Sequence, residues 1–180
     1  MPRNRYDQTK QAKREEIVAA ASSLFLSEGY DGASMGKIAA AAGLTPNTLY
    51  WYFGDKDELF VAVADLYLEL LLQQHASVAE QPLAGQLVWL VDSLRPVRHL
   101  VATVHARVAR SPGIAEWHSG FHRKVEALFE GQLTMEVSGA RRDAEVAVVT
   151  FAIEGAVTHD LDAGATADLC HSLVQRLEGL

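Results

Sequence analysis

The segment TPNTLYWYFGDKDELF, which begins at Thr45, contains two helix starts separated by one break, and it constrains the fold more than any other part of the chain. Thr45 can cap the first helix with its hydroxyl, and Pro46 suits a first helical position because that position needs no N–H. Gly54 then ends the helix, and Asp55 with Glu58 forms the pattern of a capping box. The segment predicts a short helix followed at once by a second helix.

The two faces of this short helix differ in character. Leu49 and Phe53 are four residues apart and share one face, which is suited to a core. The other face carries hydrogen-bonding and stacking side chains, namely Asn47, Thr48, Tyr50, Trp51 and Tyr52. Each aromatic taken alone could simply pack against a neighbour, but three consecutive aromatics cannot all face one core. The pattern indicates a helix whose outer face binds another molecule and recognises its surface.

The residues before this segment predict two further helices. From about Thr9 to Gly29 apolar residues recur at three- and four-residue steps, and Gly29 supplies the helix end. Ser34 can cap a second short helix, which closes at the turn residue Gly43. Residues 1–8 are polar and are predicted to be an arm. A longer helix followed by two short ones with a glycine-containing turn predicts a unit of the helix-turn-helix kind.

The rest of the chain also has helical periodicity, with proline and glycine at the boundaries and no strand-like alternation. The predicted fold is all-α with about nine helices: a helix-turn-helix domain at 1–56 and a second helical domain at 57–180. The later helices are predicted at about 55–75, 83–94, 96–110, 114–137, 143–161 and 167–177. The helix at 143–161 is apolar nearly all round and must be covered on two sides.

Composition narrows the function. At 180 residues and 49% hydrophobic content, the chain can bury a core, and no apolar run is long enough to span a bilayer. No signal-peptide pattern opens the sequence, so a cytoplasmic protein without membrane association is expected. Cys170 is the single cysteine, which rules out an internal disulfide.

The net charge of −7 argues at first against a nucleic-acid partner. However, residues 1–14 hold five basic side chains and one acid, whereas residues 61–180 hold nine basic and fifteen acidic side chains. The acidity therefore resides mostly outside the helix-turn-helix unit. A helix of this size fits the major groove, where Asn47 can pair with adenine. Phosphate contacts would come from donors around it, namely Ser34, Thr48, Tyr50, Tyr52 and Lys56.

The segment from about Lys10 to Phe60 resembles the DNA-binding domain of the TetR family of bacterial transcriptional regulators. The matching residues are Ile17 and Phe25 of the first helix, Gly29-Tyr30, the IAAAAG turn that ends at Gly43, and TLYWYF followed by Lys56 and Glu58-Leu59. The resemblance implies a recognition helix that enters the major groove. It implies the following DNA-binding residues: Ser34, Thr45, Pro46, Asn47, Thr48, Tyr50, Trp51, Tyr52 and Lys56.

The same resemblance implies a homodimer joined through the last two long helices. The two-sided apolar helix at 143–161 suits such an arrangement, although an ordinary buried core helix is the alternative. Gly155 is unfavourable inside a helix, which a close helix crossing would explain. The residues predicted for the dimer interface are Val149, Ile153, Gly155, Val157, Leu169 and Leu173.

A cavity between helices is the predicted place for a small-molecule effector, because helical bundles hold ligands there. Its predicted lining is Trp89, His105, Trp117, Phe121 and Phe151. His118 and His122 stand four residues apart and could share a metal, but no neighbouring acid or cysteine completes a ligand set, so no metal or cofactor is expected.

These patterns together predict a ligand-responsive regulator, a homodimeric repressor that a small molecule releases from palindromic operator DNA. An activator of the same family is an alternative. The rival from another class is a metal-dependent hydrolase built on the histidine cluster, for which no nucleophile elbow, phosphate loop or zinc-protease signature is present. An enzyme is therefore not expected.

Overall fold

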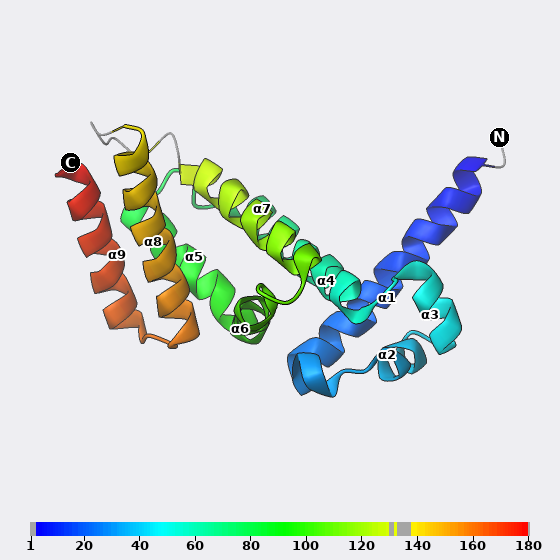
Figure 1. The fold of residues 1–180 in the computed structure, drawn as a ribbon. Coiled ribbons are helices and arrows are strands. Elements are labelled where there is room, and N and C mark those ends of the chain that lie inside the picture. Colours follow the sequence, from blue (N-terminus) through cyan, green and yellow to red (C-terminus); the bar gives the residue numbers. More distant parts are fainter. Residues whose placement is uncertain (1–2, 130–131, 133–137, 180) are drawn as a thin grey trace. The chain divides into compact units, whose positions relative to one another are not determined.

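The computed structural model describes residues 3–129, 132 and 138–179, with the backbone alone for residues 3–8. These residues form helices joined by turns, which confirms the all-α prediction (Figure 1). They group into two compact units, Met1–Leu68 with Thr103–Trp117 and Glu69–Ala102 with His118–Leu180. No helix among the described residues is both long and apolar enough to cross a membrane.

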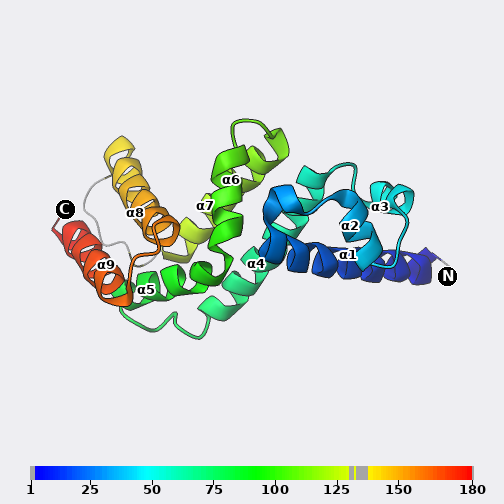
Figure 2. The same ribbon diagram turned by 90° about the horizontal axis from the view of Figure 1, so that it is seen from below.

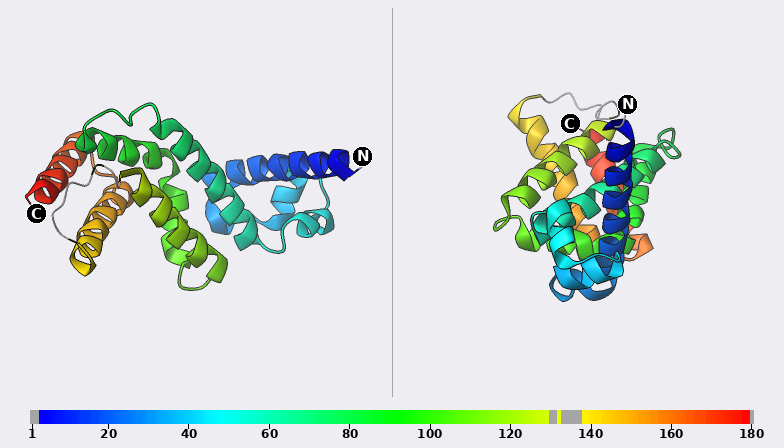
Figure 3. Two further views of the ribbon diagram at one scale, coloured as in Figure 1. Left: turned by 90° about the horizontal axis from the view of Figure 1, so that it is seen from above. Right: turned by 90° about the vertical axis from the view of Figure 1, so that its right-hand side faces the viewer.

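The N-terminal unit contains the predicted helix-turn-helix arrangement. This arrangement is formed by α1 (Arg3–Gly32), α2 (Met35–Ala41), α3 (Pro46–Tyr52) and the first part of α4 (Lys56–His75). The two short helices α2 and α3 lie on the same side of α1 (Figures 2 and 3). The core of this unit includes the following side chains, each buried to at least 99%: Ile17, Ala21, Phe25, Ile38, Leu49, Phe53, Leu59, Phe60 and Val63.

The turns in this unit follow the sequence signals. Gly29 has φ +73° and interrupts α1, and Gly43 has φ +67° after α2. The N–H of Gly43 bonds the carbonyl of Ala40 at 3.1 Å, and the N–H of Leu44 bonds the carbonyl of Ala39 at 2.8 Å. This pair of bonds is a Schellman motif, which requires the left-handed backbone that glycine adopts without strain.

The start of α4 is held by a charged group of three side chains, which we call the Asp57 clamp. Arg107, the last residue of α6 (Arg98–Arg107), donates from Nε to Asp57 Oδ1 at 3.0 Å and from Nη2 to Oδ2 at 2.9 Å. The Tyr30 hydroxyl also donates to Asp57, and the Arg107 guanidinium lies 4.3 Å from the centre of the Tyr30 ring. The Asp57 clamp thus joins α1, α4 and α6.

The contacts in the Asp57 clamp shift the pKa values of Asp57 and Tyr30. Burial alone would raise the pKa of Asp57, but the hydrogen bonds from Arg107 and Tyr30 outweigh it, so the pKa lies below its ordinary value. Burial raises the pKa of Tyr30, and the neighbouring Asp57 carboxylate raises it further. Asp57 is consequently held as an anion between a cation and a hydroxyl donor.

In the C-terminal unit, α5 (Leu83–Leu94) packs against both α8 (Ala140–Thr158) and α9 (Ala163–Glu178), which also contact each other. The 3₁₀ turn η1 (Arg95–Val97) follows α5, and α7 (Pro112–Phe129) contributes its residues from His118 onward to this unit. The buried apolar side chains of α5, α8 and α9 include Leu87, Leu90, Val91, Ile153, Val157, Cys170, Leu173 and Leu177.

Several boundaries differ from the sequence prediction. The first helix extends back to Arg3, where a polar arm was expected, and the sixth helix is preceded by the 3₁₀ turn because Pro96 cannot donate within a helix. The last helix begins earlier, at Ala163, since Asp162 caps it by accepting the N–H of Ala165 at 2.9 Å. The predicted continuation of the seventh helix to residue 137 lies outside the described residues. The compact units divide within α4, whereas the functional boundary at residue 56 stays a prediction.

The depressed pKa of Asp57 predicts a stability that depends on pH. Its contribution should be fully present above the unfolded-state aspartate pKa of about 4 and should be lost as the pH falls toward the folded-state value. Urea denaturation of the wild type between about pH 6 and pH 3, compared with Asp57→Asn, measures this contribution.

At pH 6 we expect Asp57→Asn to lower the free energy of unfolding by about 1.5–3 kcal/mol, the range for hydrogen bonds to charged groups. The difference between wild type and variant should shrink toward pH 3. Asp168→Asn, on the exposed side of α9, is the matched control and should change little. A difference that is the same at every pH would contradict the assignment.

Candidate nucleic-acid interface and cavity

The helix α3 has one face buried in the core of the N-terminal unit and one face exposed to solvent. The Thr45 hydroxyl caps it by accepting the N–H of Thr48 at 3.3 Å, and Pro46 takes the first helical position. Leu49 and Phe53 are fully buried, whereas Tyr50 is 50% and Trp51 58% exposed. The polar and aromatic face predicted from the sequence is therefore the face that solvent reaches.

The remaining predicted DNA-binding residues lie on the same unit. The side chains of Ser34, Thr45, Pro46, Asn47 and Thr48 are all exposed, and Tyr52 is half-buried. Ser34 caps α2, with its hydroxyl accepting the N–H of Lys37 at 3.2 Å. Because α2 packs against α3, the capped end of α2 and the exposed face of α3 belong to one continuous helical pair. This arrangement offers hydroxyls, an amide and aromatic rings to an extended ligand.

Lys56 has a different environment from the one expected for a phosphate contact. Its ammonium donates to the carbonyls of Tyr30 at 2.8 Å and Ala33 at 3.2 Å, and it lies 4.0 Å from the centre of the Tyr30 ring. These bonds tie the start of α4 to the segment that follows Gly29. Lys56 therefore has a structural role in addition to any contact with phosphate.

Basic residues of α1 lie beside α3, and sequence reasoning had not assigned them to this surface. Lys10 Nζ lies 4.6 Å from the centre of the Trp51 ring. Lys13 donates to the carbonyl of Ala42 at 3.2 Å, and Arg14 donates to the carbonyl of Tyr52 at 3.1 Å. Lys13 and Arg14 thus satisfy carbonyls at the ends of α2 and α3. Lys10 and Lys13 stand three residues apart on one helical face, a spacing that was available in the sequence.

A surface hollow of about 330 Å³ lies between α1 and α3. It is lined by Thr9, Lys10, Ala12, Lys13, Glu16, Trp51 and Tyr52. A cation beside an exposed indole can place both charge and a flat ring against the same partner. The hollow therefore extends the candidate surface from α3 onto α1.

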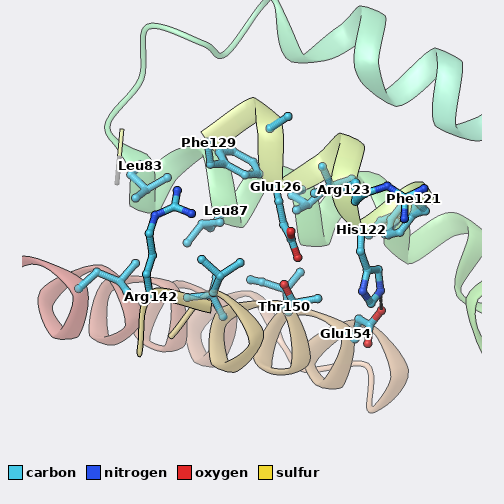
Figure 4. A pocket seen from close by; sticks show the side chains of 18 residues that line it. Leu83, Leu87, Phe121, His122, Arg123, Glu126, Phe129, Arg142, Thr150 and Glu154 are labelled. Atoms are coloured by element: carbon cyan, nitrogen blue, oxygen red, sulfur yellow. Dashed lines mark hydrogen bonds and ion pairs between the residues drawn. The ribbon is translucent and has the colours of Figure 1, made fainter. Parts of the chain in front are cut away.

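The C-terminal unit contains a cavity of about 200 Å³ between α5, α7 and α8 (Figure 4). Much of its wall is apolar: Leu83, Leu87, Leu90, Leu94, Phe121, Val125, Ala127, Phe129, Val146, Val149, Ile153 and Leu177. Polar and charged side chains complete it: His122, Arg123, Glu126, Arg142, Thr150 and Glu154. An apolar space with a few polar groups at its wall has the character of a small-molecule site.

The residues predicted to line a pocket are mostly elsewhere, and only Phe121 of the five lines this cavity. Trp89 packs its ring 5.6 Å from that of His75, and Trp117 Nε1 donates to Asp65 at 2.8 Å. His105 belongs to the N-terminal unit, and Phe151 is 67% exposed. The prediction placed aromatic side chains in the cavity, but the rotation of each helix about its axis determines which side chains face it. Most of the apolar side chains in the wall are leucines and valines.

The residues predicted for a dimer interface also differ from the exposed surface. Ile153, Val157 and Leu173 are buried within the C-terminal unit, and Val149 lines the cavity. Gly155 and Leu169 are partly exposed. The large apolar side chains that α8 leaves exposed are Val148 at 41% and Phe151 at 67%. The predicted interface residues Ile153, Val157 and Leu173 therefore pack within one chain, whereas Val148 and Phe151 of α8 remain exposed.

Comparison with known proteins finds a family match in the N-terminal unit. A family model of bacterial regulatory proteins, the tetR family, matches residues 17–63. The transcriptional regulator AcrR of Shigella flexneri is 37% identical over 81 residues, which cover 43% of this chain and 38% of AcrR. The regulator UidR of Escherichia coli K12 is 25% identical over 171 residues, which cover 88% of this chain and 82% of UidR. The chain spans about a quarter to two-fifths of the first curated relatives it matches.

Solved structures share the fold. A TetR-family transcriptional regulator from Streptomyces coelicolor superposes with a TM-score of 0.72 at 18% sequence identity, covering 91% of this chain and 79% of that one. The family match lies on α1 to α4, which include the capped helix α3 and the glycine turn before it. Sequence and fold agree: residues 17–63 match the model of the tetR family of bacterial regulatory proteins, and the chain shares the fold of that solved regulator.

Proposed function

We propose that this protein is a homodimeric DNA-binding transcriptional repressor whose hold on operator DNA is controlled by a small molecule. The observation that carries the proposal is the exposed polar and aromatic face of α3, fixed outward by the burial of Leu49 and Phe53. The family match covers the same helices, and relatives such as AcrR and UidR are named as transcriptional regulators. Those names give no support to the hydrolase alternative.

The chemistry of α3 suits the major groove. Asn47 can accept from and donate to adenine, and Pro46 and Trp51 can meet thymine methyl groups. Thr45, Thr48 and Tyr50 carry hydroxyls at the rim of the helix, where phosphates would lie. Tyr52 is half-buried and would contribute from the side. In a dimer, two such helices would enter successive major grooves about 34 Å apart on a near-palindromic site.

A ligand in the C-terminal cavity would act through helices that belong to both units. α7 lines the cavity from Phe121 onward, and its residues 112–117 group with the N-terminal unit. A ligand that favours one position of α7 would therefore bias the unit that contains α3. Ligand binding and DNA binding would then oppose each other by the same free energy.

The surface proposed for dimerisation is the outer side of α8. Val148 and Phe151 are large, apolar and exposed there, and Gly155 follows Phe151 by four residues on the same side. A second copy of the same helix would bury these side chains and approach closely at the glycine. This assignment replaces the inner residues of α8 predicted from the sequence, because those residues already pack within one chain.

The first test concerns base recognition. We expect Asn47→Ala to reduce the preference for the selected operator over random DNA by roughly 5- to 150-fold, the range for one bidentate base contact. Selection from a random pool would supply the operator, and fluorescence anisotropy would measure both affinities. Lys10→Ala should weaken binding to both DNAs. It should also reduce the slope of log affinity against log salt concentration by about one.

Gln73→Ala, on the exposed side of α4, is the control and should bind as the wild type does. Lys56→Ala is less informative because it also removes two bonds to backbone carbonyls. If Asn47→Ala lowered the affinities for operator and random DNA equally, α3 would not be the helix that recognises the bases.

The second test concerns the dimer. Phe151→Glu should convert the protein from dimer to monomer, because a carboxylate would have to be buried where a phenyl ring packs. Light scattering coupled to size-exclusion chromatography measures the mass directly. Leu70→Glu places the same charge on another exposed apolar residue, at 41% exposure, and should leave the dimer intact. A dimer that persists in Phe151→Glu with unchanged helicity would refute this interface.

A further inference from the structure

Two histidines and a glutamate meet at one edge of the C-terminal cavity. His118 and His122 are four residues apart on α7, and Glu154 comes from α8. His122 Nε2 lies 2.7 Å and His118 Nε2 lies 3.4 Å from the same atom, Glu154 Oε1 (Figure 4 shows the shorter contact). The two imidazole rings are 4.2 Å apart between centroids. Three side chains with metal-binding atoms therefore converge from two helices.

The spacing of these atoms is close to that of a metal coordination sphere. With bonds of about 2.0–2.2 Å and tetrahedral angles, ligand atoms on one zinc ion lie about 3.3 Å apart. The distances from Glu154 Oε1 to His122 Nε2 and to His118 Nε2, 2.7 and 3.4 Å, bracket this value. Small rotations of the side chains would place an ion between the three atoms. Two histidines at i and i+4 on a helix with a carboxylate from elsewhere are also a ligand set that zinc sites use.

We propose that His118, His122 and Glu154 form a binding site for a divalent transition-metal ion of the zinc class. Imidazole nitrogen with carboxylate oxygen suits Zn²⁺, Co²⁺ and Ni²⁺ better than Mg²⁺ or Ca²⁺, which prefer oxygen ligands alone. The three side chains are between 16% and 21% exposed, so an ion can reach them from solvent while most of their surface is held in place.

An ordinary ion pair explains this arrangement less well. A simple ion pair joins one histidine to one carboxylate, whereas here both imidazoles lie close to the same carboxylate oxygen. The ring centroids are 4.2 Å apart, and one divalent ion can bind a nitrogen of each ring together with that oxygen. Glu154 would then supply the negative charge that a cation site requires.

The site also indicates the class of molecule that the cavity would take. His122 and Glu154 are part of the cavity wall, and the rest of that wall is largely apolar. Three protein ligands leave a tetrahedral ion with one open position. The ion would therefore accept a small molecule with an apolar body and a metal-binding head, such as a carboxylate or a phenolate. This step rests on the proposed function, whereas metal binding itself does not.

The test uses purified, full-length protein without a histidine tag, dialysed against a chelator and then into buffer. Calorimetric titration with Zn²⁺ should give one saturable site per chain, and Co²⁺ should give the strong visible absorption of tetrahedral cobalt. His118→Gln, His122→Gln and Glu154→Gln should each weaken zinc binding by at least about tenfold and remove the cobalt spectrum. His171→Gln, on the exposed side of α9, is the matched control and should behave as the wild type.

Absence of a saturable site in the wild type would overturn the proposal, whatever the variants do. Zinc binding that is unchanged in folded His122→Gln and Glu154→Gln, as judged by circular dichroism, would also overturn it. The same samples can be titrated with operator DNA to test the proposed function separately. A protein that binds zinc at this site and binds no DNA would support the metal site and refute the regulator.

Discussion

The burial of Leu49 and Phe53 is the constraint on which the N-terminal unit depends. Both side chains are fully buried, and they fix the rotation of a helix only seven residues long. A helix of two turns has little stability by itself, so its position comes from packing and capping. Thr45 at one end, and Arg14 bonded to the carbonyl of Tyr52 at the other, complete that support. Asn47, Tyr50 and Trp51 are exposed as a consequence.

The same physical reasoning explains why α8 serves several purposes. Ile153 and Val157 face the core, Val149 and Glu154 face the cavity, and Phe151 faces solvent. A helix that is apolar nearly all round must be covered on more than one side. The chain itself covers the inner side and leaves Phe151 exposed. One helix therefore lies between the cavity and the surface proposed for a second copy, so a ligand and a partner would act on the same element.

Local signals predicted much of this structure, and long-range contacts account for what they missed. Caps at Ser34 and Thr45 and the turn at Gly43 depend on neighbouring residues, so spacing along the chain revealed them. The Asp57 clamp joins residues 50 positions apart, and Glu154 reaches His122 across 32 positions. No local pattern contains such pairs. This is why the histidine pair appeared to lack an acid, and why the cavity lining was assigned to aromatic residues that lie elsewhere.

The acidic character of the chain limits how DNA could be held. In the N-terminal unit, Lys13 and Arg14 bond carbonyls at the ends of α2 and α3, Lys56 bonds two more carbonyls, and Arg107 is held by Asp57. These cations are largely engaged in stabilising the fold, so only part of their charge is available to phosphates. Affinity would then depend on hydroxyls, on helix N-termini and on two copies binding together. For such a protein, a small change in the spacing of the two reading helices would be enough to release DNA.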